Sequence, residues 1–235
     1  MTLRVGTVTN LGQHHVDPQR ITFFRRCLSV WYRKKGRVLP WRSSRCSPYE
    51  LLVAEVLLQR TQAQRVATFF PQFIRVYPSW STLANTSESD LRSVIEPLGL
   101  WRRRAVALLS LARAVIQHGG QLPTTREQLE SLPAIGQYIA NAVLTFCHGG
   151  REPLLDSNMS RVLERFFGPR KLADIRYDPY LQALSRLVLA RGDAKKLNWA
   201  ILDFAALVCT LWDPDCSSCP LKQKCSAFGK NRHSS

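Results

Sequence analysis

Four cysteines near the C-terminus have the spacing of a metal or cluster site. They form the pattern C-x6-C-x2-C-x5-C and are Cys209, Cys216, Cys219 and Cys225. Thiolates are soft ligands, and four of them in a tetrahedral set can hold either a zinc ion or an iron–sulfur cluster. The spacing alone leaves both possibilities open.

Glu55 is the second residue that could carry chemistry. It is the only charged residue between Leu51 and Leu58, in an apolar segment that predicts a buried helix over residues 49–62. Burying a lone carboxylate is costly unless it is paired or protonated. Glu55 is therefore either a structural acid bonded to a neighbouring helix or a proton donor that its apolar surroundings keep protonated. The residues alone do not separate these two roles.

Asp156 stands directly before an amphipathic segment, residues 157–167. An aspartate in that place is the expected N-cap of the helix. A capping role also fixes where the carboxylate lies, so it is compatible with a catalytic role.

The stretch LPAIGQYIANAVL, residues 132–144, predicts a tight turn that leads into a helix. Such a turn points backbone N–H groups outward at a helix N-terminus, where they can bind a phosphate without sequence preference. Pro133, Ile135 and Gly136 are the candidate residues for this contact. Gly136 has no side chain and would let a nucleic-acid backbone approach closely.

The elements that would position these groups are helices. Apolar residues recur at helical spacing from Ile21 onward, and no run alternates with period two. The other helical segments are 66–76, 87–95, 102–118, 125–132, 179–190 and 195–209. We therefore predict an all-α fold of about ten helices.

The charge balance indicates a polyanionic partner. The chain of 235 residues has 33 Lys+Arg against 17 Asp+Glu, a net charge of +16, and its basic residues are dispersed rather than gathered in a tail. Residues 1–20 lack the apolar core of a signal peptide, and the longest apolar region is too short to cross a bilayer. We expect a cytoplasmic protein that binds nucleic acid and makes no membrane contact, and a monomer by default. Seven cysteines in such a protein favour metal or cluster chemistry over disulfides.

These features occur together, and in this order, in one family. The chain resembles, over about residues 21–228, the helix–hairpin–helix DNA glycosylases that end in a four-cysteine iron–sulfur loop, the endonuclease III and adenine glycosylase superfamily. The matching motifs are LPWR at 39–42, SPYELLVAEVLLQRTQ at 47–62, LPAIGQYIANAV at 132–143, LLDSNMSRVLERFFG at 154–168 and the cysteine loop.

The resemblance implies two helical domains of the endonuclease III type. A six-helix domain with the hairpin would span 46–150, and a discontinuous domain would combine 21–45 with 151–235 and carry a [4Fe–4S] cluster in the loop 209–225. Residues 1–20 would be a flexible leader. The resemblance also makes Asp156 the catalytic aspartate.

Four features of the sequence indicate the branch of the family. Bifunctional endonuclease III members carry a lysine where this chain has Tyr138, so the Schiff base needed for β-lyase strand cleavage is not expected. Glu55 matches a glutamate shared by adenine glycosylases and mismatch thymine glycosylases. Residues 98–105, LGLWRRRA, are closer to the thymine glycosylase pattern, and the ten residues after Cys225 leave no room for the second domain of adenine glycosylases.

The resemblance favours a monofunctional glycosylase that removes thymine or uracil opposite guanine from double-stranded DNA. Residues 59–62, QRTQ, instead approach the adenine glycosylase motif, so excision of adenine opposite 8-oxoguanine or guanine is the alternative, followed by excision of another damaged base. A DNA-binding module without catalysis is the non-enzyme alternative, which intact Glu55 and Asp156 argue against.

The mechanism implied by the resemblance assigns a role to each candidate residue. The target nucleotide is flipped into a pocket, Glu55 donates a proton to the departing base, and Asp156 stays ionised to offset charge on the sugar and to orient water. Tyr138 lines the sugar pocket. The DNA contacts would come from the hairpin, from a gap-filling turn and from a basic loop that the cluster folds: Gln59, Arg60, Thr61, Gln62, Lys222 and Lys224.

One position departs from the family pattern. The hairpin turn is usually Pro-Gly-x-Gly, but Ala134 takes the place of the first glycine. Its methyl group weakens the phosphate contact unless the residue has a negative φ, in which case alanine is tolerated.

Overall fold

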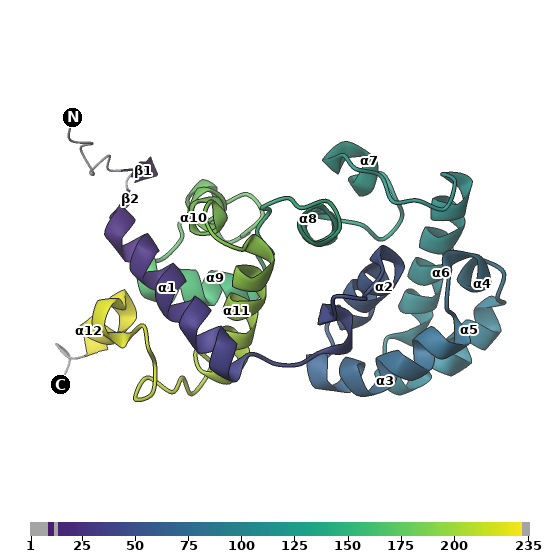
Figure 1. Ribbon diagram of the computed structural model, residues 1–235, viewed down its shortest axis with the longest axis horizontal. Helices are drawn as coiled ribbons and strands as arrows, with labels where there is room; N and C mark the ends of the chain where they lie inside the picture. The colour runs from purple at the N-terminus through teal and green to yellow at the C-terminus, as the bar shows by residue number, and fades with distance from the viewer. Residues whose placement is uncertain (1–8, 12–13, 232–235) are drawn as a thin grey trace. The chain divides into compact units, whose positions relative to one another are not determined.

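The computed structural model describes residues 9–11 and 14–231, which divide into two compact units. One unit spans residues 38–149. The other combines residues 150–231 with the described residues up to Arg37. The chain passes from one unit to the other at Arg37/Val38 and again at Gly149/Gly150 (Figure 1).

The unit of residues 38–149 is built around α2. Its elements are η1 (Pro40–Arg42), α2 (Pro48–Leu58), α3 (Ala63–Val76), α4 (Trp80–Ala84), α5 (Glu88–Ile95), η2 (Glu96–Leu98), α6 (Trp101–Gln117), α7 (Arg126–Glu130) and α8 (Gln137–Phe146). Helix α2 begins with a capping box, in which Ser47 and Glu50 each accept a hydrogen bond from the other's backbone N–H. Residues 51–57 are all buried, and α3, α6 and α8 pack around them. This apolar helix is therefore the centre of the unit's core.

The second unit joins the two ends of the chain. Its elements are β1 (Thr9–Leu11), β2 (His14–Val16), α1 (Pro18–Lys35), α9 (Ser157–Phe167), α10 (Pro179–Leu189), α11 (Ala194–Leu207), η3 (Lys222–Lys224) and α12 (Ser226–Asn231). Helices α1 and α11 lie side by side (Figure 1). At the end of α1, Arg37 donates to the fully buried Asp203 of α11 through its backbone N–H and its Nε, each at 2.7 Å. Because a buried carboxylate needs partners, this bond fixes the point where the chain leaves the unit.

The all-α prediction is confirmed, with three local differences. Strands β1 and β2 form a small antiparallel ribbon, and Asp17 caps α1, which begins at Pro18. The ribbon and the start of α1 therefore fall within the segment 1–20 expected as a leader. Residues 1–8 and 12–13 of that segment lie outside the described residues. The helix expected over 49–62 ends at Leu58, and the short helices α4 and α12 were not predicted. The helices described include no segment with the length and hydrophobicity needed to cross a membrane.

Candidate active site

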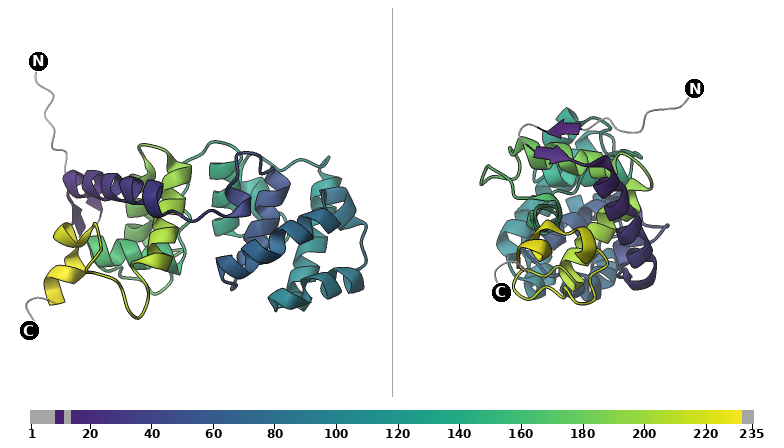
Figure 2. Two further views of the ribbon diagram at one scale, coloured as in Figure 1. Left: turned by 60° about the horizontal axis from the view of Figure 1, so that its bottom comes forward. Right: turned by 90° about the vertical axis from the view of Figure 1, so that its left-hand side faces the viewer.

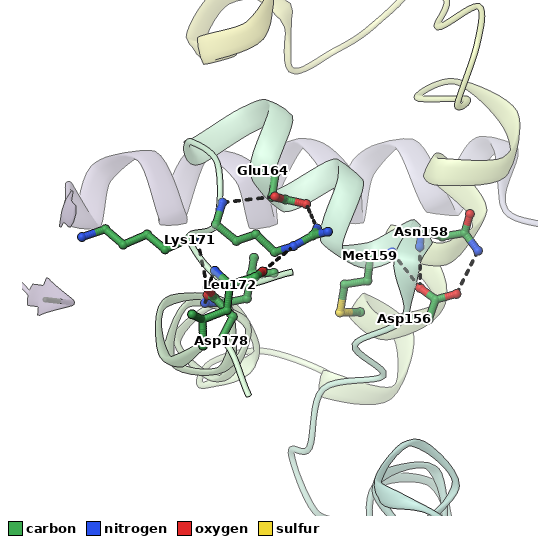
Figure 3. A network of polar contacts seen from close by, with 9 residues as sticks. Asp156, Asn158, Met159, Glu164, Lys171, Leu172 and Asp178 are labelled. Carbon is green, nitrogen blue, oxygen red and sulfur yellow. Dashed lines mark hydrogen bonds and ion pairs between the residues drawn. The ribbon is translucent and has the colours of Figure 1, made fainter. Parts of the chain in front are cut away.

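Asp156 is the N-cap of α9, as expected from the sequence. One carboxylate oxygen accepts from the backbone N–H groups of Asn158 at 2.9 Å and Met159 at 2.7 Å, and the other accepts from the Asn158 side-chain amide at 2.8 Å (Figure 3). The residue is half-buried. Three N–H donors at the helix N-terminus hold the carboxylate in one orientation.

The segment that leads to Asp156 is fixed by a buried asparagine. Asn198 of α11 is fully buried; its Oδ1 accepts from the Leu154 N–H at 2.9 Å, and its Nδ2 donates to the carbonyls of Glu152 at 3.1 Å and Ala194 at 3.0 Å. Both amide hydrogens of Asn198 and one acceptor position of its oxygen are thus bonded to the backbone. Sequence reasoning missed Asn198, although a lone amide in an apolar helix was a usable signal.

Arg161 connects the beginning of α9 to the cysteine loop. Its Nη1 donates to Asn158 Oδ1 at 3.1 Å, and its Nε donates to the carbonyl oxygen of Cys209 at 2.9 Å. Asn158 is the same residue that bonds Asp156. Continuous hydrogen bonds therefore run from the candidate catalytic carboxylate to the first cysteine of the loop.

Glu55 and Tyr138 belong to the other unit and lie on neighbouring helices. Glu55 is 6% exposed on α2, among apolar residues. Tyr138 is half-buried on the first turn of α8 and packs against the core that surrounds α2. The two carboxylates expected to do chemistry thus have unlike surroundings: Glu55 is buried on an apolar helix, and Asp156 is half-buried among N–H donors.

The turn between α7 and α8 is the predicted helix–hairpin–helix. Pro133, Ala134 and Gly136 are exposed, whereas the Ile135 side chain is 5% exposed and belongs to the core. Gly136 precedes α8 without a side-chain cap, and a Cβ added there would meet nothing within 4 Å. The turn therefore leaves the first N–H groups of α8 uncovered, and Ile135 can offer a ligand only its backbone.

Ala134 has a φ of +63°, in the left-handed region. The condition under which alanine would be tolerated without strain, a negative φ, is not met. A Cβ in this region crowds the following carbonyl, so the turn holds Ala134 in a conformation that glycine adopts more easily.

The turn between α2 and α3 carries the residues expected to fill a gap in DNA. Gln59, Arg60 and Gln62 are exposed, and Thr61 is half-buried. A pocket of about 370 Å³ lies beside this turn. Its lining comes from α2, α6, the turn after α2, the residue before α6 and the α7–α8 turn: Val56, Gln59, Arg60, Leu100, Arg103, Arg104, Ala107 and Ala134. The pocket combines apolar walls with guanidinium and amide donors.

The four cysteines of the C-terminal loop are free thiols and half-buried. Arg165 of α9 bonds two of them: its Nη1 donates to Cys209 Sγ at 3.4 Å, and its carbonyl accepts from Cys225 Sγ at 3.3 Å. Burial is the main cause that raises the pKa of the Cys219 thiol to about 11; the other cysteines of the loop act in the same direction, and a hydrogen bond from the Leu221 backbone opposes them. Within the described part of the chain, no group of three or more His, Cys, Asp or Glu side chains lies close enough together to hold a metal ion.

Lys222 and Lys224 are exposed, but both side chains have partners inside their own unit. Lys222 Nζ donates to the Ser217 carbonyl at 2.9 Å, and Lys224 Nζ lies 5.2 Å from the centre of the Phe23 ring. The C-terminal segment that carries them, yellow in Figure 2, packs through α12 against α9. A phosphate contact by either lysine remains a prediction and would compete with these internal contacts.

Comparison with known proteins identifies the family. The profile of the family described as HhH-GPD superfamily base excision DNA repair protein matches residues 53–190. The thymine-DNA glycosylase of Aeropyrum pernix is 39% identical over 221 residues, which cover 92% of this chain and 99% of the relative. The thymine/uracil-DNA glycosylase of Pyrobaculum aerophilum is 39% identical over 90% of this chain and 94% of its own length.

Two solved structures have the same fold. The structure of a thermostable thymine-DNA glycosylase has a TM-score of 0.84 at 30% identity and covers 90% of this chain and 98% of its own. A non-covalent endonuclease III–DNA complex has a TM-score of 0.77 at 22% identity, with 93% and 99% coverage, and bears on the fold alone. Both the predicted family and the predicted enzyme class, a DNA glycosylase, are confirmed. The chain belongs to the HhH-GPD superfamily of base excision DNA repair proteins.

Proposed function

We propose that this protein is a monofunctional DNA glycosylase that hydrolyses the N-glycosidic bond of thymine or uracil opposite guanine. The observation that carries the proposal is the 39% identity to a thymine-DNA glycosylase over 99% of that relative's length. The QRTQ turn at 59–62 supports one second candidate, excision of adenine opposite 8-oxoguanine or guanine.

Two carboxylates divide the chemistry in this proposal. Glu55, 6% exposed on α2, donates a proton to the departing base. Asp156, held by three N–H donors, keeps its negative charge, offsets the positive charge that develops on the sugar, and orients the attacking water. The pattern of two carboxyl groups whose surroundings assign them different roles is the one used in glycoside hydrolysis.

Tyr138 limits the enzyme to base removal. Strand cleavage through a Schiff base needs a primary amine on the enzyme, and a phenol cannot form that bond. Tyr138 instead contacts the sugar of the target nucleotide from the first turn of α8.

DNA binding in this proposal is mostly contact with phosphates. The uncapped N-terminus of α8 takes one phosphate through backbone N–H groups, with Pro133, Ile135 and Gly136 shaping the turn. Gln59, Arg60, Thr61 and Gln62 fill the space that the flipped nucleotide leaves. The net charge of +16 supplies a non-specific attraction that falls as salt rises.

The cysteine loop is the proposed site of a [4Fe–4S] cluster held by Cys209, Cys216, Cys219 and Cys225. The donor set fits, since four free thiols stand on one loop and Arg165 bonds two of them. When bound, the cluster supplies a covalent crosslink that folds the loop. Arg165 and Arg161 hold the first part of that loop against α9 through its backbone carbonyls.

Single-turnover excision decides the substrate. Duplexes carrying T·G, U·G, A·8-oxoG and a modified cytosine are incubated with excess enzyme, and the released base is quantified. Release from T·G and U·G is expected. Release from A·8-oxoG alone would favour the second candidate, and tight binding with no release from any duplex would leave a DNA-binding module.

The role of Asp156 is tested by a pair of matched variants. Asp156→Asn keeps a side-chain acceptor for the α9 cap but removes the charge, so binding should persist while base release is abolished. Asp193→Asn makes the same change at the N-cap of α11 and should leave release intact. Retained activity in Asp156→Asn would overturn the assignment.

A further inference from the structure

Besides the hairpin turn with Ala134, two turns of the 38–149 unit hold non-glycine residues in the left-handed region. Arg60, between α2 and α3, has a φ of +55°, and Leu100, before α6, has a φ of +52°. Such conformations persist only where the surroundings enforce them, and they gather at functional sites. Both residues line the 370 Å³ pocket, and Leu100 is 48% exposed although it is apolar.

One side chain bonds both turns. Arg104, on the first turn of α6, is 4% exposed. Its Nη2 donates to the Gln59 carbonyl at 2.6 Å and to Thr61 Oγ1, the residues on either side of Arg60. Its Nη1 donates to the Leu98 carbonyl at 3.1 Å and to the Gly99 carbonyl, directly before Leu100. We call turns 59–62 and 98–100, joined in this way, the paired turns.

The geometry of this contact requires a guanidinium. Each terminal nitrogen of Arg104 serves a different turn, so the planar fork sets the spacing between them. A lysine ammonium is a point charge with no such fork and could not reproduce the four contacts. Arg65 of α3 adds a bond to the Pro97 carbonyl but none to the 59–62 turn among the contacts described.

The contacts and the burial of Arg104 leave it no accessible group for direct recognition. Its Nη1 and Nη2 are bonded to four acceptors of the paired turns, and its Nε–H is buried away from the surface, without a partner among the described residues. Burial lowers the pKa of Arg104, as does the charge of Arg65, yet a guanidinium stays charged at neutral pH. Arg104 therefore acts through Arg60 and Leu100, which it orients.

We propose that Arg104 is a positioning residue that locks the paired turns in one arrangement, so that Arg60 and Leu100 meet the mismatched duplex together. The proposal rests on the proposed glycosylase function. It predicts that breaking the fork loosens both turns at once, although they lie about forty residues apart in the sequence.

The first test needs no DNA. Hydrogen–deuterium exchange is measured on peptides covering 59–62 and 98–100 in wild type, Arg104→Lys and the control Arg113→Lys. Arg113 lies on the same helix and donates to the Ala84 carbonyl, away from the pocket. Exchange should quicken at both paired turns in Arg104→Lys and at neither in Arg113→Lys. Unchanged exchange, or a change at one turn alone, would overturn the proposal.

The second test follows base flipping and excision. A 2-aminopurine beside the target base reports flipping, and excess enzyme gives the single-turnover rate. A misplacement of about 1 Å costs on the order of 100-fold in rate, so Arg104→Lys should lose about 10- to 100-fold in excision and most of the flipping signal. Its Kd for an undamaged duplex should change less than about twofold, because dispersed phosphate contacts dominate that binding.

The outcomes distinguish a failure of the positioning role of Arg104 from a failure of the proposed glycosylase function. Wild-type protein that releases no base contradicts the proposed function, while the exchange experiment still decides the role of Arg104. Arg104→Lys with wild-type flipping and excision would refute the positioning role. If Arg104→Ala fails to fold, Arg104→Lys, with its melting temperature checked by circular dichroism, carries the test.

Discussion

Replacing Ala134 with glycine should stabilise the protein. Alanine at a φ of +63° places its Cβ close to the following carbonyl oxygen, whereas glycine has no Cβ and adopts this region freely. Ala134 is exposed, so removal of its methyl group leaves no buried cavity. The substitution changes little except backbone strain and the entropy of the unfolded chain.

These two effects oppose each other, and the strain is larger. Left-handed backbone costs a non-glycine residue about 1–2 kcal/mol. Glycine makes the unfolded chain more flexible, which removes about 0.4–1 kcal/mol of stability. The net gain is about 0.5–1 kcal/mol, which raises the melting temperature of a chain of this size by about 1–4 °C.

Thermal melts and urea titrations of the intact protein measure this gain. Ala114→Gly is the matched control, because Ala114 lies in the last turn of α6 with helical backbone, where the same substitution should cost up to about 1 kcal/mol. Opposite signs for the two variants are expected. A loss of stability in Ala134→Gly would refute the assignment of strain to this turn.

Three further predictions concern other parts of the molecule. Tyr138→Lys should add weak strand cleavage, seen as a borohydride-trapped covalent adduct; its absence would count against contact between residue 138 and the sugar. Burial disfavours the charge of Asp178, but the N–H donors of Leu172, Leu181 and Lys171 outweigh it and hold its pKa below the ordinary value (Figure 3). The stability that this carboxylate contributes is therefore complete above about pH 4 and is lost as the pH falls through the folded-state pKa. Asp178→Asn should lower the free energy of unfolding at pH 6 and make it depend less on pH. Urea titrations from pH 6 to pH 3 measure both effects. Cys219→Ser should lower iron content and visible absorbance, whereas Cys27→Ser should not; zinc in place of iron in the wild type would refute the cluster.

Local sequence patterns were enough to predict the helices and several of their ends. The apolar run of α2 and the aspartate cap of α9 are signals carried by neighbouring residues, and both appear as expected. Helix α4 also has a local signal, since Ser79 and Thr82 form its capping box. It was missed because this capping pattern was not used as a signal and its five residues show no clear period.

The features that sequence could not predict depend on distant residues. Nothing in QRTQ ends a helix, yet α2 ends at Leu58, and the turn that follows is bonded by Arg104, 45 positions away from Gln59. The positive φ of Ala134 is likewise invisible in a residue that normally favours helix. Buried polar residues such as Asn198 could be noticed in the sequence, but their partners could not be named.

The double duty of Asp156 has an evolutionary consequence. Folding asks of position 156 only an acceptor for the N–H groups that begin α9, and an amide oxygen supplies one nearly as well as a carboxylate. The proposed catalytic role also requires the charge. If that proposal holds, one substitution, from carboxylate to amide, separates a repair enzyme from a stable protein that binds a lesion and leaves it in place. A lineage could cross that boundary in either direction without passing through an unfolded intermediate.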